Sequence, residues 1–451
     1  MAVITRFAPS PTGMLHIGSA RTALFNYLFA RHMGGQFKLR VEDTDAARNS
    51  EAAYQAILDG LKWLGLSHDG DVVYQNKNAS RHKEVAEELV NRGGAYYCYT
   101  TTEHLAEQRA AAEAKGEVFK YDRKWRDANI APPEGVKPSI RIKAPLTGEV
   151  VVKDAVQGDV TFPTTELDDL VILRSDGTPT YNLAVVVDDH DMGVTHVIRG
   201  DDHLNNAARQ SVIYQEMGWD VPVFAHIPLI HGTDGAKLSK RHGATGTMEY
   251  ATMGYLPEAM RNYLAKLGWG HGDDEIFSDA QAIEWFTLEH IGKAPARLDF
   301  AKLNHVNAHY LRLKSGAELA ALLGLSEAMA AAIESVKVKV STLVELKDSV
   351  QFYLAAPTSY DEKAAGVLTK NGANIPLVLT ALEALLEPWS PEAVKAAIND
   401  VATQSGKKIG ELMPPLRAAV VGAMSGPDIP DAMAILGKQE SISRLKHAIA
   451  A

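Results

Sequence analysis

The chain has 451 residues, of which 46% are hydrophobic and 23% charged, a composition that indicates a globular protein of two to four domains. Its net charge of −10 argues against a non-specific RNA coat protein, although a local basic surface can still bind phosphates. A single cysteine, Cys98, excludes an internal disulfide. The N-terminus lacks a signal-peptide pattern, and no apolar run approaches the roughly 20 residues that span a bilayer. We therefore expect a cytoplasmic protein that has no membrane partner.

The first predicted element is a short strand at residues 3–4, which ends before a turn rich in proline and glycine at residues 9–13. A helix follows, because apolar side chains recur every three or four residues through residues 20–28. Ser19 is its predicted N-cap, and the glycines at residues 34–35 are its predicted stop. Together these elements form half of a βαβ unit.

The start of this helix is a candidate phosphate site, because the backbone N–H groups at a helix start bind anions. His16 stands at this entrance, and Gly18 lacks the Cβ that would keep a nucleotide away. A histidine beside a turn glycine is more often an ordinary surface feature. By itself this pattern leaves both interpretations open.

The second predicted strand, residues 37–42, alternates apolar and polar side chains and carries Glu42 at its carboxyl end. Ligands of open α/β sheets bind at that edge, which makes Glu42 a candidate binding residue. The alternative is an ordinary surface carboxylate. A helix predicted at residues 52–64 ends at Gly65.

Residues 78–171 interrupt the α/β pattern with an α+β segment of short elements. The predicted elements are helices at residues 80–93 and 103–115 and strands at residues 140–143, 148–153 and 160–162.

The α/β pattern resumes with an apolar run at residues 181–189, which predicts a central parallel strand. Another predicted strand, residues 195–203, ends in charged side chains, and a helix follows at residues 204–218. Arg199 lies near the end of this strand, as Arg6 lies at the end of the first. A guanidinium binds a carboxylate through two parallel hydrogen bonds, so this pair suits an acidic substrate, although structural ion pairs are the commoner role.

Residues 235–243, GAKLSKRHG, form a glycine-bracketed loop that carries Lys237 and Lys240. Basic loops are usually only solvated. Amphipathic segments then continue to the end of the chain and predict an all-α region. The main predicted helices are at residues 317–323, 326–336, 342–354, 374–386, 391–404, 408–422 and 441–450.

Two of these stretches resemble paired signatures of one enzyme class. HIGS at residues 16–19 and KLSKR at residues 237–241 resemble the HIGH and KMSKS motifs of class I aminoacyl-tRNA synthetases. PSPTG at residues 9–13 and VEDTD at residues 41–45 are similar to the glutamyl and glutaminyl branch. Over essentially its whole length the chain resembles the bacterial glutamyl-tRNA synthetases.

Three alternatives were weighed against this resemblance. A small glutamyl-queuosine tRNA modifier, or a HIGH-type nucleotidyltransferase that acts on a metabolite, would lack the helices beyond Lys314. A catalytically inactive RNA-binding relative would not need the intact His16 and the two loop lysines.

The resemblance implies an α/β fold: a Rossmann-like catalytic domain with an α+β acceptor-binding insertion, plus an all-α C-terminal anticodon-binding domain. The implied boundaries are residues 1–77 and 172–232 for the halves of the catalytic domain, 78–171 for the insertion, 233–314 for the KLSKR loop with a region that contacts the tRNA stem, and 315–451 for the helical domain.

The resemblance also implies the reaction: ATP, accompanied by Mg²⁺, activates L-glutamate as glutamyl adenylate, and the glutamyl group passes to tRNA(Glu). Relatives need tRNA for the first step, and we expect the same here. The implied catalytic residues are His16, Lys237 and Lys240. The implied glutamate-binding residues are Arg6, Ser10, Glu42, Tyr181 and Arg199. The implied ATP-binding residues are His16, Gly18, Asp202, His203, Lys237 and Lys240.

The chain departs from some relatives at a zinc site in the insertion. Those relatives have a Cys-x-Cys pair and a later Cys-x-His, whereas this chain has Cys98, Thr100, Trp125 and Asp127 at the corresponding positions. One thiol and one carboxylate do not make a tetrahedral structural zinc site, so we expect no zinc and no other metal site.

The sequence is least decisive about which tRNA is charged. Discriminating relatives use an arginine of the helical domain. The corresponding segment of this chain, residues 336–369, contains no arginine, and its basic residues are Lys337, Lys339, Lys347 and Lys363. A lysine reads a base edge less selectively than a planar guanidinium, which favours a relaxed enzyme that also charges tRNA(Gln). Discrimination by another residue is an equal alternative. We expect a monomer.

Overall fold

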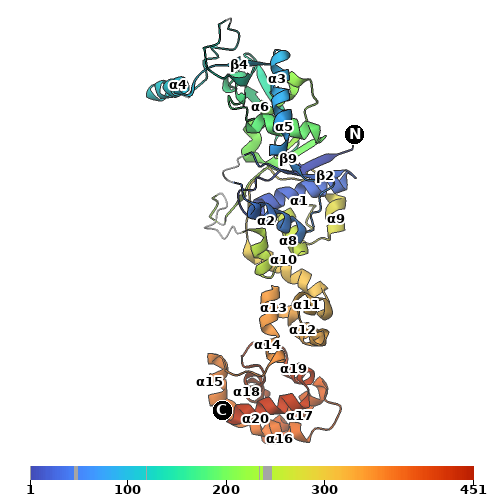
Figure 1. Cartoon of the computed structure of the whole chain (residues 1–451). Helices are drawn as coiled ribbons and strands as arrows, with labels where there is room; N and C mark the ends of the chain where they lie inside the picture. The colour runs from blue at the N-terminus through green and yellow to red at the C-terminus, as the bar shows by residue number, and fades with distance from the viewer. Residues whose placement is uncertain are drawn as a thin grey trace. The chain divides into compact units, whose positions relative to one another are not determined.

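We describe a computed structural model of the chain, which covers residues 2–44, 49–117, 119–128, 130–232, 234–236 and 246–450. The chain divides into two compact units, each with its own interior (Figure 1). The first unit comprises residues 1–250 and 260–299, and the second comprises residues 251–259 and 300–451.

The first unit mixes strands and helices. Its strands are β1 (Ile4–Phe7), β2 (Gln36–Val41), β3 (Val73–Tyr74), β4 (Ala95–Cys98), β5 (Ser139–Ile142), β6 (Glu149–Asp154), β7 (Gly158–Pro163), β8 (Val171–Leu173), β9 (His196–Gly200), β10 (Val223–Ile227), β11 (Ile230–His231) and β12 (Ala296–Arg297). Its helices are α1 (Ile17–His32), α2 (Glu51–Trp63), α3 (Ala79–Asn91), α4 (Thr102–Ala114), α5 (Tyr181–Asp191), α6 (Leu204–Met217) and α9 (Asp279–Trp285). Helices α7 (Thr247–Thr252) and α8 (Pro257–Lys266) each cross a boundary between the units.

Two sheets of the first unit meet at β1 and β9. β1, β2 and β3 form a parallel sheet, and a second sheet has the order β7-β6-β10-β9 with parallel pairing around β10. Thr195, just before β9, donates its backbone N–H to the carbonyl oxygen of Ile4 in β1 at 2.9 Å. The carboxyl ends of β1, β2 and β9 border one cavity, at the edge where open α/β sheets bind ligands.

β2 confirms the predicted alternation, because Phe37, Leu39 and Val41 are all buried. The opposite face does not reach solvent at Arg40, whose exposure is 0%. Gly35 permits β2 to start alongside β1, since a Cβ at this position would lie 2.0 Å from the carbonyl oxygen of Val3. Residues 36–41 therefore carry both a packed face and a buried charge.

The strand predicted at residues 181–189 is wrong, because this segment forms helix α5. Residues 183–189 are all buried, so no exposed polar face reveals a helical period. For a short apolar run buried on all sides, hydrophobic pattern does not separate a helix from a strand.

The predicted N-cap of α1 is also wrong. The helix begins at Ile17, and the N-cap position belongs to His16, whose backbone is extended and whose side chain caps nothing. The carbonyl of His16 accepts the first helical hydrogen bond, from the N–H of Ala20 at 2.8 Å. Ser19 therefore lies in the first turn of the helix.

The segment between the two halves of the α/β fold contains the predicted short strands. β4, β5 and β8 form an antiparallel sheet, whereas the β6–β7 hairpin joins β10 through the pair Asp154 and Phe224. One apolar core runs through this segment and the α/β part, with Val85, Ile140 and Val186 among its members. The boundaries assigned from the sequence stay predictions.

The second unit is helical throughout its described residues. Its helices are α10 (Phe300–Leu313), α11 (Gly316–Leu322), α12 (Ala330–Val336), α13 (Leu343–Ser349), α14 (Gln351–Leu354), α15 (Glu362–Asn371), α16 (Ile375–Ala384), α17 (Pro391–Ser405), α18 (Ile409–Val421), α19 (Ile429–Leu436) and α20 (Lys438–Ala450). Each helix predicted in this region is present, but residues 342–354 form two helices, and α10, α15 and α19 were not predicted. Across the described ranges, no helix is long and apolar enough to cross a membrane.

Candidate active site

A cavity of about 440 Å³ lies where the carboxyl ends of β1, β2 and β9 approach the first turns of α1 and α5. Every glutamate-binding residue predicted from the sequence lines it, and so do three of the predicted ATP-binding residues. These residues are Arg6, Ser10, Gly18, Glu42, Tyr181, Arg199, Asp202 and His203. Segments up to 197 residues apart in the chain therefore converge on one cavity, although their roles in it stay predictions.

Arg6 is held by a carboxylate from α5. Its Nε and Nη2 donate to Oδ1 and Oδ2 of Asp189 at 3.0 and 3.2 Å, and both side chains are buried. Arg40 donates to the same carboxylate through Nη1. Burial works to raise the pKa of Asp189, but the guanidinium groups of Arg40 and Arg6 outweigh it and hold the pKa below its usual value of 3.8. Asp189 is therefore a fixed negative charge between two arginines.

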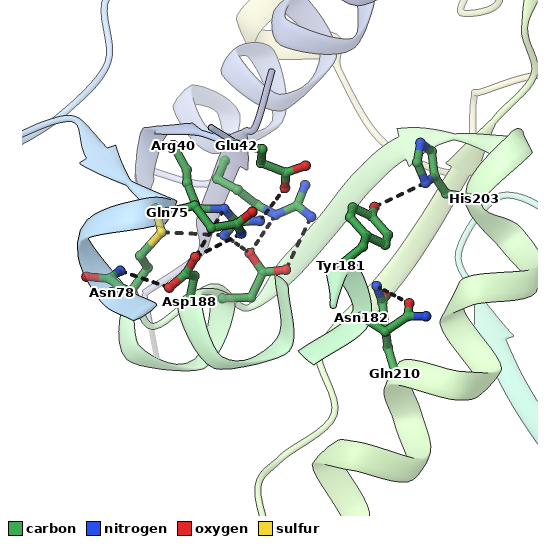
Figure 2. A network of polar contacts seen from close by, with 12 residues as sticks. Arg40, Glu42, Gln75, Asn78, Tyr181, Asn182, Asp188, His203 and Gln210 are labelled. Carbon is green, nitrogen blue, oxygen red and sulfur yellow. Dashed lines mark hydrogen bonds and ion pairs between the residues drawn. The ribbon is translucent and has the colours of Figure 1, made fainter. Parts of the chain in front are cut away.

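Glu42 shares Arg40 with Asp189. Arg40 Nη2 donates to Glu42 Oε1 at 3.0 Å, and Figure 2 shows the guanidinium lying between Glu42 and Asp188. The carboxylate of Asp188 accepts hydrogen bonds from the side-chain amides of Gln75 and Asn78. Burial raises the pKa of Glu42, and Arg40 offsets part of this effect. A cation that enters the cavity beside Glu42 would favour the ionised form of its carboxyl group.

Arg199 differs from Arg6 because the described structure pairs it with no carboxylate. Its Nε donates to Nε2 of His226 at 3.0 Å, and Nη2 donates to the carbonyl oxygen of His203 at 3.4 Å. Nη1 is buried and has no hydrogen-bond partner. Burial lowers the pKa of Arg199 below that of a solvated guanidinium. A buried donor without a partner is costly, so a carboxylate that reaches Nη1 gains a strong, charge-assisted bond.

Tyr181 and His203 form another part of the wall. The Tyr181 hydroxyl lies 3.1 Å from Nδ1 of His203, and the close-up shows the two side chains pointing toward one another (Figure 2). Burial and the nearby Glu42 raise the pKa of Tyr181 to about 12, so its hydroxyl keeps its proton. A Cβ at Gly18 would meet no atom within 4 Å, which leaves the wall open at the first turn of α1.

Of the predicted catalytic residues, His16 alone lies among the described residues, and it does not line this cavity. His16 is exposed at the start of α1, and Lys237 and Lys240 lie outside the described residues. The chain returns to His16 directly after that segment, because Gly246 forms an isolated β-bridge with it. The N–H and the hydroxyl of Thr247 both donate to the Leu15 carbonyl at 2.7 Å. The described chain therefore resumes, after the segment that carries the second signature, beside the first signature.

Sequence reasoning missed four residues that shape the site. Arg21 lines the cavity from α1, with Nη1 donating to the Leu267 carbonyl at 2.7 Å, and burial lowers its pKa to about 10. Arg40, Asp189 and His226 hold the predicted residues from behind. The only sequence signal was the pair of carboxylates, Asp188 and Asp189, at the end of the apolar run 181–189. Because this run was predicted to be a strand, the directions of the two side chains could not be predicted.

Comparisons with known proteins agree with this geometry. Residues 2–305 match the family described as tRNA synthetases class I (E and Q), catalytic domain, and residues 305–449 match the anticodon binding domain. The chain is 55% identical to Glutamate--tRNA ligase 2 of Brucella ovis and to Glutamate--tRNA ligase 1 of Brucella melitensis biotype 1, over 99% of each chain.

Solved structures are similar over the full length. A glutamate tRNA ligase from Elizabethkingia meningosepticum, crystallised in complex with its amino acid, has a TM-score of 0.90 at 34% identity, with 100% of both chains covered. A glutamate-tRNA synthetase from Elizabethkingia anophelis has a TM-score of 0.86, also at 34% identity and with full coverage of both chains.

A parallel α/β fold with its ligand cavity at the carboxyl edge, joined to an anticodon-binding helical domain, defines a class I aminoacyl-tRNA synthetase. Within that class, the chain belongs to the glutamyl-tRNA synthetases. The fold class expected from the sequence is confirmed.

Replacement of Asp189 tests the network behind the cavity. Asp189→Asn leaves Arg6 and Arg40 buried without their shared charge, so we expect the free energy of unfolding to fall by about 3–5 kcal/mol in urea titrations. Glu88→Gln is the control, because its pair with Arg92 is exposed on α3 and should change stability by less than about 0.5 kcal/mol. Equal stability of the two variants would contradict the network.

The pH dependence of stability gives a second measurement of the same network. Asp189 has a lower pKa in the folded protein than its usual 3.8, so its stabilisation is fully present above that pH. It is lost as the pH falls through the lowered folded pKa. The difference in stability between the wild type and Asp189→Asn should therefore shrink below about pH 4.

Proposed function

We propose that the chain attaches L-glutamate to tRNA(Glu) in an ATP-dependent reaction (EC 6.1.1.17), with Arg199 as the anchor for the substrate carboxylate. The observation that carries the assignment of Arg199 is that this residue lines the cavity and that its buried Nη1 has no hydrogen-bond partner. Family membership supports the reaction as a whole.

In the proposed complex, Arg199 binds the side-chain carboxylate of glutamate and Glu42 binds its ammonium group. Arg6, Tyr181 and Ser10 complete the contacts from the same wall of the cavity. Glutamine would bring an uncharged amide to Arg199 and leave the guanidinium desolvated and unpaired, which selects glutamate.

ATP would bind toward the first turn of α1, where Gly18 leaves space and the helix start attracts phosphates. Asp202 and His203 are assigned to the adenosine. His16, Lys237 and Lys240 are assigned to the phosphates, with Mg²⁺ carried in on the phosphate oxygens. The α-carboxylate oxygen of glutamate attacks the α-phosphorus, and the bond to the β-phosphate oxygen breaks to release pyrophosphate. Positioning and charge neutralisation supply most of the catalysis.

Transfer of the glutamyl group requires the end of the tRNA beside the adenylate. A second cavity of about 670 Å³ shares Ser10, Glu42 and Tyr181 with the first and opens toward Arg174. We assign it to the terminal adenosine, whose 2′-hydroxyl oxygen attacks the activated carbonyl carbon while AMP leaves. Both substrates would then meet at the shared wall.

The insertion supports the proposal that no zinc is bound. Sγ of Cys98 lies 3.2 Å from the Tyr121 hydroxyl and 3.3 Å from Nε of Arg141, whose guanidinium lies 3.8 Å from the Tyr121 ring centroid. Trp125 packs against this cluster, and Asp127 is exposed and paired with Lys143 at 3.0 Å. A guanidinium thus occupies the neighbourhood of the thiol in place of further metal ligands.

The helical domain supports relaxed recognition of tRNA, so that tRNA(Gln) is also charged. Two of the lysines of the candidate segment are engaged by the protein itself, since Lys337 pairs with Glu334 at 2.7 Å and Lys339 donates to the Gly426 carbonyl at 2.7 Å. Lys347 and Lys363 are exposed. We also propose that the protein is a monomer and that it is located in the cytoplasm. The free cysteine Cys98 supports the location, because disulfides are rare in that reducing compartment.

Replacement of Arg199 tests the glutamate site. Arg199→Gln removes the charge that binds the carboxylate, so the KM for glutamate should rise about 100-fold or more in ATP–pyrophosphate exchange with tRNA present. Discrimination against glutamine should weaken at the same time. Arg92→Gln, on the exposed face of α3, is the control. An unchanged KM for glutamate in Arg199→Gln would remove Arg199 from the site.

Elemental analysis of the purified protein tests the absence of zinc. We expect less than stoichiometric metal and unchanged activity after dialysis against a chelator, because Thr100 and Trp125 provide no ligands. Stoichiometric zinc that resists chelation would contradict this reading of the Cys98 cluster.

Charging assays with purified tRNA(Glu) and tRNA(Gln) test the relaxed specificity. We expect comparable kcat/KM for the two tRNAs, since residues 336–369 contain no arginine that could read the anticodon base. tRNA(Glu) that carries the anticodon of tRNA(Gln) is the control that isolates this base. A strong preference for tRNA(Glu) would show that another residue discriminates.

A further inference from the structure

Three buried groups behind the cavity form a chain of hydrogen bonds: Asp154, His226 and Arg199. Oδ2 of Asp154 lies 2.6 Å from Nδ1 of His226, and Nε2 of His226 accepts from Nε of Arg199 at 3.0 Å. The side chains of His226 and Asp154 have 0% exposure. The three residues lie on the adjacent strands β6, β10 and β9, which makes the arrangement rigid.

The chain of bonds determines which nitrogen of His226 carries the proton. A guanidinium only donates hydrogen bonds, so Nε2 must be unprotonated to accept from Arg199. The proton therefore lies on Nδ1 and is donated to Asp154. Asp154 is itself held by the backbone N–H groups of Val156 and Gln157 at 2.9 and 2.8 Å. This carboxylate keeps the imidazole in one tautomer and one orientation.

We propose that His226, held by Asp154 with its proton on Nδ1, positions the Arg199 guanidinium for the substrate carboxylate and releases it when the imidazole is protonated. The inference rests on the proposed role of Arg199 in binding glutamate. His226 is a positioning residue, because it acts on the substrate through Arg199.

The physical advantage lies in the neutrality of His226. Arg6 is held by the carboxylate of Asp189, which neutralises much of its charge. Arg199 is held by an uncharged acceptor, so its full positive charge and its Nη1 are left for the substrate. A carboxylate in the place of His226 would compete with glutamate for the same guanidinium.

Protonation of His226 would place two cations in contact and remove the acceptor for Nε. The charged and titratable groups around the imidazole are Asp154 on β6, Arg199 on β9, and Asp201 and His203 just after β9. Burial lowers the pKa of His226 below its usual 6.5, and Arg199 lowers it further, although the hydrogen bond to Asp154 opposes both. The KM for glutamate should therefore begin to rise only when the pH falls below 6.5.

A matched pair of substitutions separates the two hydrogen bonds of His226. In His226→Gln the amide reaches the place of Nε2 and keeps an acceptor for Arg199. In His226→Asn the shorter amide reaches the place of Nδ1 and leaves Nε of Arg199 without a partner. We expect His226→Asn to raise the KM for glutamate about 10-fold, the scale of one hydrogen bond to a charged group, and His226→Gln to change it about 2-fold or less.

Two readouts and one control distinguish positioning from general damage in the tRNA-dependent exchange assay. The KM for ATP should stay within about 2-fold of the wild type in both variants. The rise in the KM for glutamate between pH 7.5 and 5.5 should be smaller in His226→Gln than in the wild type. His196→Gln is the control, because this histidine of β9 contacts Thr195 and Phe29 and does not line the cavity.

Asp154→Asn tests the tautomer without a change at His226. The amide oxygen keeps the bonds from Val156 and Gln157, which turns the amide N–H₂ toward Nδ1 of His226. The imidazole proton must then move to Nε2, where it opposes Arg199, so the KM for glutamate should rise about 10-fold. An unchanged KM in a folded Asp154→Asn protein would overturn the tautomer assignment and the inference with it.

Arg199→Gln separates this inference from the function on which it rests. If Arg199→Gln raises the KM for glutamate but His226→Asn and His226→Gln behave alike, the inference is overturned and the glutamate site stands. If Arg199→Gln leaves that KM unchanged, the assignment of Arg199 fails, and the inference fails with it. The expected result is a large effect in Arg199→Gln, a smaller one in His226→Asn and none in His226→Gln.

Discussion

The carboxylate of Asp189 is the interaction on which the first unit depends, because it holds Arg6 of β1 and Arg40 of β2 in a region without solvent. None of these three charges is stable there alone, since removal of one leaves another uncompensated. The two ion pairs therefore connect β1 and β2 to α5. Asp188, the next residue in the helix, pairs with His82 at 2.8 Å and so connects the same helix to the insertion.

The same electrostatic logic divides the arginines that border the cavity into two kinds. Arg6 is bound to a carboxylate of the protein, which neutralises much of its charge. Arg199 is bound only to neutral acceptors, a histidine and a backbone carbonyl. Arg199 therefore lines the cavity with a positive charge that no carboxylate of the described residues pairs, and the carboxylate of Glu42 stands just after another strand, β2. This polarity matches an amino acid that carries a carboxylate on its side chain.

The insertion is organised around a buried carboxylate in the same way. Asp169 is fully buried and accepts hydrogen bonds from Arg126 at 2.8 Å and from the hydroxyl of Tyr96 at 2.9 Å. Arg141 donates to its backbone carbonyl at 2.6 Å and also contacts Cys98. A buried carboxylate surrounded by arginines thus organises this segment, as Asp189 organises the catalytic part. Such a network connects strands and loops that a bound metal would otherwise connect.

The sequence by itself determined the family, the α/β and all-α parts, and eight of the residues that line the cavity, because these depend on short motifs and on local periodicity. The alternation of β2 and the stop after α2 at Gly65 are local in the same sense. Only the tertiary structure decided that residues 181–189 are helical, that Arg40 is buried, and that His226 holds Arg199. The physical reason is that each of these depends on partners distant in the chain: Arg40 meets Asp189 149 residues away, and His226 meets Asp154 72 residues away. A segment that is buried on every side shows no hydrophobic periodicity from which a helix or a strand could be predicted. A charged residue can be identified as buried only once folding has brought an opposite charge beside it.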